Sequence, residues 1–262
     1  MAALIVAHGG QPRVAPSMRE VPLESNIQAV AFAEALVAGA FDVVVLLTGV
    51  GTRVLLNVVE QAHGTGAPFV ASLGRVKVAV RGPKPLAVIR ELGLEPWVIA
   101  GEPNTWRELL AGIDLRAAEA PLAGQRVAVQ EYGTANPEFI AALEARGALV
   151  TPVPVYQWAL PEDLGPLEDA CRALADGGVD VVLFTTGTQV VHLLQVADRM
   201  AVGDVVRNAL SRAVVASIGP TTSEELRAQG VAVHLEPSHP KMGVLVREAA
   251  ERSAGLKNVA RS

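Results

Sequence analysis

The sequence has little of what several common kinds of protein site require. Its single cysteine, Cys171, excludes an internal disulfide framework and a cysteine-based zinc site. The five histidines show neither H-x-x-x-H nor H-x-H spacing, so a compact metal site has little support. Because a lone cysteine in a helix-like stretch suits a reducing compartment, we expect a cytoplasmic protein with Cys171 in its core.

Charge and long apolar runs are also scarce. Only 19% of the 262 residues are charged and the net charge is −5, whereas a nucleic-acid-binding surface usually needs a basic excess. No apolar run approaches the roughly 20 residues of a membrane span. The first ten residues lack the basic region and the cleavage site of a signal peptide. We therefore expect a soluble monomer that binds neither nucleic acid nor membranes.

A glycine-rich turn resembles a nucleotide-binding loop but fails the known motifs. The stretch DVVVLLTGVGTR (42–53) places Gly49 and Gly51 after an apolar run, but Val54 stands where a dinucleotide-binding motif needs a third glycine. The P-loop motif and the G-x-S-x-G elbow are both absent, so the sequence offers no obvious covalent machinery. A tight bend from strand to helix explains one such turn equally well.

What the sequence does contain is a repeat. Aligning Asp42 with Asp180 gives eight identities between 42–58 and 180–196, at an offset of 138 residues. The stretches at 76–93 and 214–230 then match at an offset of 137, each with a strand, Gly-Pro, a helix and a closing glycine. Two consecutive strand-turn-helix units repeated at one spacing indicate two similar α/β lobes.

The near-continuous apolar runs predict strands that helices cover on both faces. Each lobe should therefore hold a doubly wound parallel sheet of the Rossmann or flavodoxin type. Prolines at 152 and 154 suit an edge strand or a tie between lobes, and we expect a cleft between the lobes. The predicted parts are a continuous lobe at 27–150, a discontinuous lobe made of 1–20 plus 165–262, and connectors at 21–26 and 151–164.

Four glycine turns in two matched pairs follow predicted strands. In doubly wound sheets, ligands bind at the carboxyl ends of the strands, where the next helix presents free amides. One turn also carries charge, because five cations and no acid lie between Ser72 and Arg90. Lys84 falls in a predicted first helical turn, where the helix dipole disfavours a cation by about 0.3–1 kcal/mol. An anionic ligand and a merely solvated lysine account for this equally well.

Small hydroxyl side chains recur at the same predicted strand ends, namely Thr48, Thr186 and Thr188. Thr221 and Thr222 each precede a glutamate by three residues, which predicts a capping box that uses one of the two hydroxyls and leaves the other to face the cleft. A structural role alone can explain each threonine.

The chain has two tyrosines, Tyr132 after a predicted strand and Tyr156 in the second connector. Tyr156 can act as a weak general acid, or it can simply pack its ring beside Trp158 and hydrogen-bond its hydroxyl. Thr105 and Glu108 predict a capping box at the start of another helix.

The ordered set of these motifs resembles the uroporphyrinogen-III synthase family across nearly the whole chain. The segments that carry the resemblance are DVVVLLTGVGTR, VAVRGPKP, ELGLEP, RVAVQEYG, PVPVYQW, DVVLFTTGT, IGPTTSEELRAQGV and PSHPKMGVLVREA. The resemblance implies a two-lobed enzyme of tetrapyrrole and haem biosynthesis, with a two-stranded tie between the lobes. Such an enzyme closes linear hydroxymethylbilane to uroporphyrinogen III, with loss of water and inversion of ring D, without metal or cofactor.

The resemblance also implies roles for individual residues. Tyr156 matches the tyrosine that assists ionisation of the terminal hydroxymethyl group, which makes it the expected proton donor. The substrate carries eight carboxylates, which suit amides, hydroxyls and a few cations around a wide cleft. The expected substrate-binding residues are Thr48, Gly49, Arg81, Gly82, Lys84, Tyr132, Thr186, Gly187, Thr188, Gly219, Thr221 and Thr222.

The amino-terminal sequence departs from this pattern. Family members usually open with a strand and a full first helix, whereas this chain resembles a family member that begins inside that helix. We expect either that the native chain extends upstream or that the discontinuous lobe lacks its first strand.

Three other functions remain open. The first alternative is a non-catalytic two-lobed module that binds a tetrapyrrole or a small anion. The second is a hinged receptor of the periplasmic type, which the absence of an export signal disfavours. The third is a nucleotide-dependent oxidoreductase, which Val54 disfavours.

Overall fold

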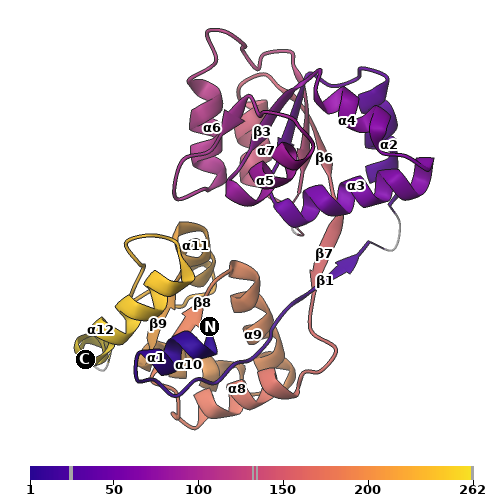
Figure 1. Ribbon diagram of the computed structural model, residues 1–262. Coiled ribbons are helices and arrows are strands. Elements are labelled where there is room, and N and C mark those ends of the chain that lie inside the picture. Colours follow the sequence, from indigo (N-terminus) through magenta and orange to yellow (C-terminus); the bar gives the residue numbers. More distant parts are fainter. Residues whose placement is uncertain (24–25, 132, 134, 261–262) are drawn as a thin grey trace. The chain divides into compact units, whose positions relative to one another are not determined.

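The computed structural model describes residues 1–23, 26–131, 133 and 135–260 (Figure 1). The chain divides into two compact units. Unit 1 consists of Met1–Arg19 and Ala159–Ser262, and unit 2 consists of Glu20–Trp158. Tyr132, an expected substrate contact, lies outside the described residues. Among the residues that the structure does describe, no helix combines the length and hydropathy of a membrane span.

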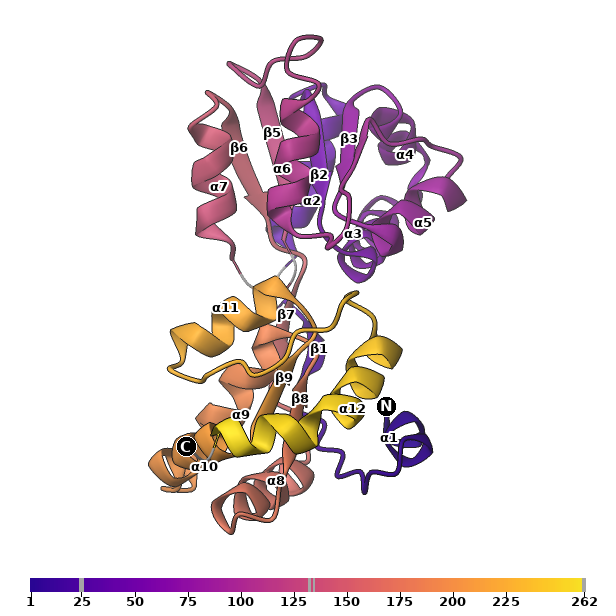
Figure 2. The ribbon, with the colours of Figure 1, turned by 90° about the vertical axis from the view of Figure 1, so that its left-hand side faces the viewer.

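Unit 2 is built on a five-stranded sheet in which every pairing is parallel. The strands are β2 (Val43–Leu46), β3 (Lys77–Val80), β4 (Val98–Ile99), β5 (Arg126–Gln130) and β6 (Leu149–Val153). They lie in the order β4-β3-β2-β5-β6, and Figure 2 shows β6, β5, β2 and β3 side by side in this order. The chain moves outward from β2 in one direction and from β5 in the other, so the winding reverses between these two strands.

Helices cover both faces of this sheet. They are α2 (Ile27–Val37), α3 (Gly49–His63), α4 (Ala67–Leu73), α5 (Pro83–Glu91), α6 (Trp106–Asp114) and α7 (Pro137–Glu144). Alternate strand residues point to opposite faces. Val44 and Leu46 therefore join one core with α2, α3 and α4, while Val43 and Val45 join another with α6 and α7. The prediction of an α/β protein with parallel sheets is confirmed.

Unit 1 contains fewer strands than the predicted doubly wound sheet. Its elements are α1 (Ala2–Ala7), α8 (Gly165–Ala175), β8 (Val181–Phe184), α9 (Gly187–Arg199), α10 (Gly203–Arg212), β9 (Val214–Ser217), α11 (Pro220–Ala228) and α12 (Met242–Ala260). Within the described residues, its sheet consists of the parallel pair β8 and β9 with an isolated bridge from Ala216 to Leu235. Cys171 lies buried in α8, where burial raises its pKa to about 11, so it is a core residue as predicted.

The sequence repeat corresponds to a repeated strand pairing. Val43 pairs with Lys77 in unit 2, and Val181 pairs with Val214 in unit 1, at offsets of 138 and 137 residues. The pairing of Ala79 with Val98 recurs as the bridge from Ala216 to Leu235, at an offset of 137. Strands β8 and β9 and the bridge at Leu235 therefore pair in the same register as β2, β3 and β4.

The two stretches of chain at which the units divide pair with each other in a two-stranded sheet. It pairs β1 (Arg19–Pro22) with β7 (Tyr156–Ala159). Strand β6 continues to Val153, so the first residues of the expected second connector belong to the sheet of unit 2. Pro152 lies in β6, which is the edge strand of the sheet. Proline has no N–H to donate, and an edge strand tolerates this because it has a neighbour on one side only.

Candidate functional site

The candidate site lies in unit 2 at the carboxyl ends of β2 and β5, where the winding of the sheet reverses. Ligands bind at this position in open α/β sheets because two neighbouring turns diverge to opposite faces. Thr48 follows β2 and Gln130 ends β5. The amide of Thr48 donates to Oε1 of Gln130 at 3.3 Å, while Nε2 of Gln130 donates to the carbonyl of Glu131. Gln130 is only 1% exposed, so it fixes the spacing of the two turns.

Thr48 connects this turn to Tyr156. It is the N-cap of α3, and its Oγ1 accepts from the amide of Gly51 at 3.0 Å. The same Oγ1 lies 3.4 Å from the hydroxyl of Tyr156. The Tyr156 ring is 3% exposed and packs edge-on against Trp158, with ring centroids 5.3 Å apart. The packed ring confirms one of the two roles predicted for Tyr156, and its hydroxyl points at the strand end.

The segment after β5 passes closely over these two rings. Gly133 has a φ of +85°, and a side chain there would place its Cβ 2.6 Å from Cδ1 of Trp158 and 2.9 Å from Cε2 of Tyr156. Only glycine fits this approach. Sequence reasoning did not include Gln130, Gly133 or Trp158 in the site. A lone glutamine that ends an apolar strand, followed closely by a glycine, is the signal that could have identified them.

The glycines of the 48–51 turn serve helix packing. A Cβ on Gly49 would lie 2.9 Å from the backbone carbon and oxygen of Lys84, and one on Gly51 would overlap the side chain of Gln130. The N-terminus of α3 therefore approaches the first turn of α5 at backbone distance. This explains why glycines occur here without a dinucleotide-binding motif, and it brings Thr48, Gly49 and Lys84 together at one edge of the sheet.

The second turn of unit 2 follows β3. The amide of Arg81 donates to the carbonyl of Leu46, and Gly82 is the N-cap of α5. Lys84 is exposed in the first turn of α5, as predicted. Other cations of this segment have local partners: Arg75 donates to Ser72, Lys77 lies over Trp97, and Arg90 pairs with Glu95. Within the described ranges, Lys84 forms no ion pair.

A partly buried carboxylate stands beside the site. Burial raises the pKa of Glu131 above its usual range, and a hydrogen bond from the backbone amide of Asn136 opposes this shift. Asn136 is the N-cap of α7, and its side chain accepts from the amide of Phe139 at 3.0 Å. Glu131 therefore lies near the start of α7, where a negative charge is favourable.

The corresponding edge of unit 1 has the same local design. Thr186 is the N-cap of α9, and its Oγ1 accepts from the amide of Thr188 at 3.1 Å. A Cβ on Gly187 would lie 3.0 Å from Cβ of Glu225 in α11. Gly219 is the N-cap of α11, and its amide donates to the hydroxyl of Ser217 at 3.3 Å. The predicted residues of unit 1 thus gather at the carboxyl ends of β8 and β9.

The capping box predicted for Thr221 or Thr222 is wrong. Helix α11 begins at Pro220, with Gly219 as the N-cap and no side-chain cap, so both threonines lie inside the first turn. Proline favours the first helical position because its φ is already helical and it has no N–H to satisfy. Thr222 is buried and Thr221 is exposed. Of the two, Thr221 therefore presents its side chain to the surface.

The four helices that follow these turns start without acidic residues. The first turns of α3, α5, α9 and α11 contain no Asp or Glu, as is also true of α1, α2, α4 and α12, whereas those of α6, α7, α8 and α10 each contain one. Free amides at helix starts attract anions, and an acid there would oppose them. In the part of the chain that the structure describes, no group of His, Cys, Asp and Glu is arranged to hold a metal ion.

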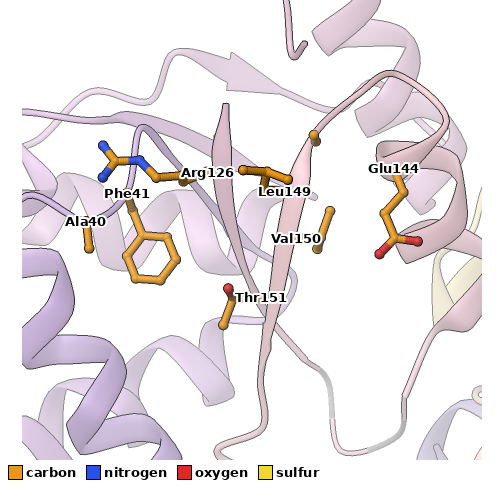
Figure 3. Close-up of a pocket in the computed structure, with 8 residues that line it drawn as sticks. Ala40, Phe41, Arg126, Glu144, Leu149, Val150 and Thr151 are labelled. Atoms are coloured by element: carbon orange, nitrogen blue, oxygen red, sulfur yellow. The ribbon is translucent and has the colours of Figure 1, made fainter. Parts of the chain in front are cut away.

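A surface hollow of about 440 Å³ lies elsewhere on unit 2 (Figure 3). Its lining includes Phe41, just before β2, and Arg126 and Leu149, which begin β5 and β6. These are the amino ends of the strands, opposite to the candidate site. Arg126 donates two side-chain bonds to Asp42, which lowers the pKa of that carboxyl to about 2. The described residues that line the hollow therefore offer no cation free for an anionic ligand.

Comparisons with known proteins agree with this arrangement. The model of the family described as Uroporphyrinogen-III synthase HemD matches residues 1–247, which span both units. A protein of Bacillus subtilis (strain 168), "Uncharacterized protein YjjA", is 31% identical over 257 residues, which is 96% of this chain and 90% of the relative.

Solved structures give the same result. A crystal structure of a mutant uroporphyrinogen III synthase from the extremely thermophilic bacterium Thermus thermophilus matches with a TM-score of 0.71 and 26% identity, over 97% of this chain and 93% of the other. A wild-type structure of that synthase matches with a TM-score of 0.54 and 27% identity, over 98% and 93% of the two chains. The chain belongs to the uroporphyrinogen-III synthase family.

Proposed function

We propose that this chain is an active uroporphyrinogen-III synthase, a hydro-lyase that cyclises hydroxymethylbilane to uroporphyrinogen III with inversion of ring D. The observation that carries the proposal is the family match over residues 1–247, because it includes the elements that bear all four turns. The contact of Tyr156 with Thr48 at the carboxyl end of β2 supports it.

The proposed reaction begins with loss of water from the terminal hydroxymethyl group. The C–O bond breaks, the oxygen takes a proton and leaves as water, and the pyrrole N–H loses a proton to give an azafulvene. We assign Tyr156 as the donor to the departing oxygen. Its hydroxyl lies 3.4 Å from Oγ1 of Thr48, which is held in place because it also accepts from the amide of Gly51. A second hydroxyl at this distance orients the phenol and can stabilise the phenolic charge.

The later steps depend on geometry. The azafulvene carbon is attacked within the same molecule, and a spiro intermediate leads to the inverted ring. Because the substrate closes unaided to the type I isomer, the protein must hold its arms so that the other closure is faster. Residues that bind the carboxylate arms therefore decide which isomer forms.

We propose that the strand-end turns bind the acetate and propionate arms. Their helix starts offer free amides without competing acids, and Lys84 adds a cation in unit 2. The residues assigned to this role are Thr48, Gly49, Arg81, Gly82 and Lys84 in unit 2, and Thr186, Gly187, Thr188, Gly219, Thr221 and Thr222 in unit 1.

A non-catalytic module that binds a tetrapyrrole or a small anion is the second candidate function. The burial of Tyr156 favours it, because a ring that is 3% exposed and packed on Trp158 can have a purely structural role. The hydroxyls of Thr48 and Thr186 are likewise engaged as helix caps. A protein with these features can bind the substrate without accelerating its closure.

One assay separates the two candidates. Freshly prepared hydroxymethylbilane is incubated with the protein, the products are oxidised, and the type I and type III isomers are resolved by chromatography. We expect type III product to exceed type I, with a protein-free sample giving type I. A sample in which type I alone forms at the unassisted rate would disprove catalysis, and porphyrin binding by that same sample would support the binding module.

A further inference from the structure

The loop between Leu235 and α12 carries charged side chains outside the four strand-end turns. Its sequence is EPSHPKMG (236–243), and it leads from the bridge with β9 into α12. His239 and Lys241 are both exposed on it. Neither side chain forms an ion pair within the described part of the chain. The loop therefore presents two nitrogen-bearing side chains to the solvent.

This loop lies against the turn that starts α11. A Cβ added to Gly219 would have one neighbour within 4 Å, Cβ of Pro240, at 3.7 Å. His239 and Lys241 flank Pro240 in the chain, so the backbone of both residues lies near the Gly219–Thr222 turn. Figure 2 shows the segment between α11 and α12 returning beside β9 before α12 begins. The loop thus adds side-chain nitrogens to an edge that offers amides and threonine hydroxyls and also holds the carboxylate of Glu225, which accepts from Gln229.

Internal hydrogen bonds fix the loop in this position. The amide and hydroxyl of Ser238 donate to the carboxylate of Glu248, at 3.1 and 2.5 Å for the shortest contacts. The amide of Lys241 donates to the carbonyl of His239 at 2.7 Å, and the amide of Leu245 donates to the carbonyl of Lys241 at 2.9 Å. Glu248 is therefore occupied by Ser238, and Glu236, the acid at the start of the loop, pairs with Arg227 at 3.6 Å.

The position of Lys241 is electrostatically unfavourable by itself. It directly precedes α12, whose first turn contains no acidic residue, and a cation at the start of a helix opposes the helix dipole. His239 contacts the hydroxyl of Ser238 at 3.4 Å, and no described acid pairs with its ring to balance a positive charge. An anion between this loop and the α11 turn would compensate both features.

We infer that His239 and Lys241 form a carboxylate-binding subsite with the Gly219–Thr222 turn and hold one carboxylate arm of the tetrapyrrole. This inference rests on the proposed function for the identity of the ligand. The subsite adds direct side-chain recognition to the carboxyl end of β9, in the same way that Lys84 does after β3. We expect it to contribute to substrate binding and not to proton transfer, because the proposed donor, Tyr156, belongs to unit 2.

The test compares His239→Gln, Lys241→Gln and the double variant with the wild type. Two quantities are measured: KM and kcat with hydroxymethylbilane, and the dissociation constant of uroporphyrin III, a stable eight-carboxylate probe, by fluorescence titration at low and high salt. We expect the double variant to raise both KM and the dissociation constant about fivefold at low salt, with kcat unchanged. The difference should shrink at high salt. Arg212→Gln is the matched control, because it removes a cation from the opposite end of β9.

The outcomes separate this inference from the proposed function. If the wild type forms only type I isomer but binds uroporphyrin III more tightly than the double variant does, the subsite is supported and the synthase activity is disproved. An active double variant with wild-type KM and wild-type probe affinity overturns the subsite alone. A wild type that forms only type I isomer and does not bind the probe overturns both. Circular dichroism of each variant verifies that these exposed substitutions leave the fold intact.

Discussion

The turns after β2 and β3 in unit 2 and those after β8 and β9 in unit 1 share one backbone design and differ in their chemistry. In both units, a threonine caps the first helix, a glycine lets that helix approach the second, and a Gly-Pro pair starts the second helix. Among the described residues, only the threonine of unit 2 also contacts a tyrosine hydroxyl. The repeat therefore preserves the geometry that collects helix starts, while the proposed proton donor occurs at one edge only.

The same comparison applies to packing. Gly49 faces the backbone of Lys84, which cannot move without shifting α5, whereas Gly187 faces the side chain of Glu225. Unit 2 has a five-stranded sheet behind this contact, and the described sheet of unit 1 has two strands and a bridge. We therefore expect equivalent substitutions to have larger effects in unit 2.

The largest effect is expected for Gly49→Ala. Its new Cβ would lie 2.9 Å from backbone atoms of Lys84, so the two helices must separate. We expect a loss of about 2 kcal/mol in the free energy of unfolding, as in other overpacked sites. The measurement is urea denaturation followed by tryptophan fluorescence, which reports on unit 2 because Trp97, Trp106 and Trp158 all lie there.

Gly187→Ala is the matched control for this prediction. Its Cβ would contact only side-chain atoms of Glu225, at 3.0 and 3.2 Å, and alanine also has the better helix propensity by about 1 kcal/mol. We expect a change below about 1 kcal/mol, measured by circular dichroism. Equal losses for the two variants would contradict the difference in packing between the units.

Tyr156→Phe tests whether Tyr156, which belongs to unit 2, is the proton donor. Removing the hydroxyl leaves the ring packed on Trp158 but deprives the departing oxygen of its donor. We expect kcat to fall more than tenfold, about 1.4 kcal/mol in activation free energy, while KM and the melting temperature stay close to wild type. Steady-state kinetics with hydroxymethylbilane checks this. Wild-type turnover in a folded variant would remove Tyr156 from the reaction.

Thr48→Val and Thr186→Val separate capping from chemistry. Each variant loses the hydroxyl that accepts a helix amide, so each should lose about 1 kcal/mol of stability. Thr48→Val should also lower kcat, because Thr48 is 3.4 Å from the phenol, whereas Thr186→Val should raise KM with kcat unchanged. Thermal melts and kinetics on the same samples give both quantities. A lowered kcat in Thr186→Val would place reaction chemistry in unit 1 as well.

Local sequence signals predicted the parts of this structure that local interactions determine. The capping box of Thr105 and Glu108 is present because its partners are three residues apart. The repeat was visible for a similar reason, since each copy keeps its strand, turn and helix in one continuous segment. The prediction for Thr221 and Thr222 failed because Pro220 starts the helix two or three residues earlier than the capping pattern requires.

Contacts between distant parts of the sequence could not be predicted in this way. Gln130 reaches Thr48 across 82 residues, and the ring nitrogen of His192 reaches the carbonyl of Ser17 across 175 residues at 2.6 Å. No spacing within either segment encodes such a pair. The motifs therefore indicated which turns form the candidate site, and only the fold shows that Gln130 connects two of them and that Trp158 supports Tyr156.

The smallest predicted effect concerns pH and the matched positions Trp97 and His234. The amide of Trp97 donates to the carbonyl of Val78 at 2.7 Å, and that of His234 donates to Val215 at 2.9 Å. In unit 1, the amide of Val215 also donates to Nδ1 of His234, which requires the neutral ring. Burial lowers the pKa of His234 below its usual value.

The unfolded state therefore binds a proton on His234 more readily than the folded state does. The free energy of unfolding falls as the pH drops below about 6.5 and levels off below the pKa of the folded state. Above the pKa of the unfolded state this group has no effect on stability. Thermal melts between about pH 8 and pH 5 by circular dichroism should show this slope, and His234→Gln should flatten it. Trp97 does not titrate, so the tryptophan-detected melt of unit 2 should be insensitive to His234→Gln. An unchanged slope in that variant would assign the pH dependence to other groups.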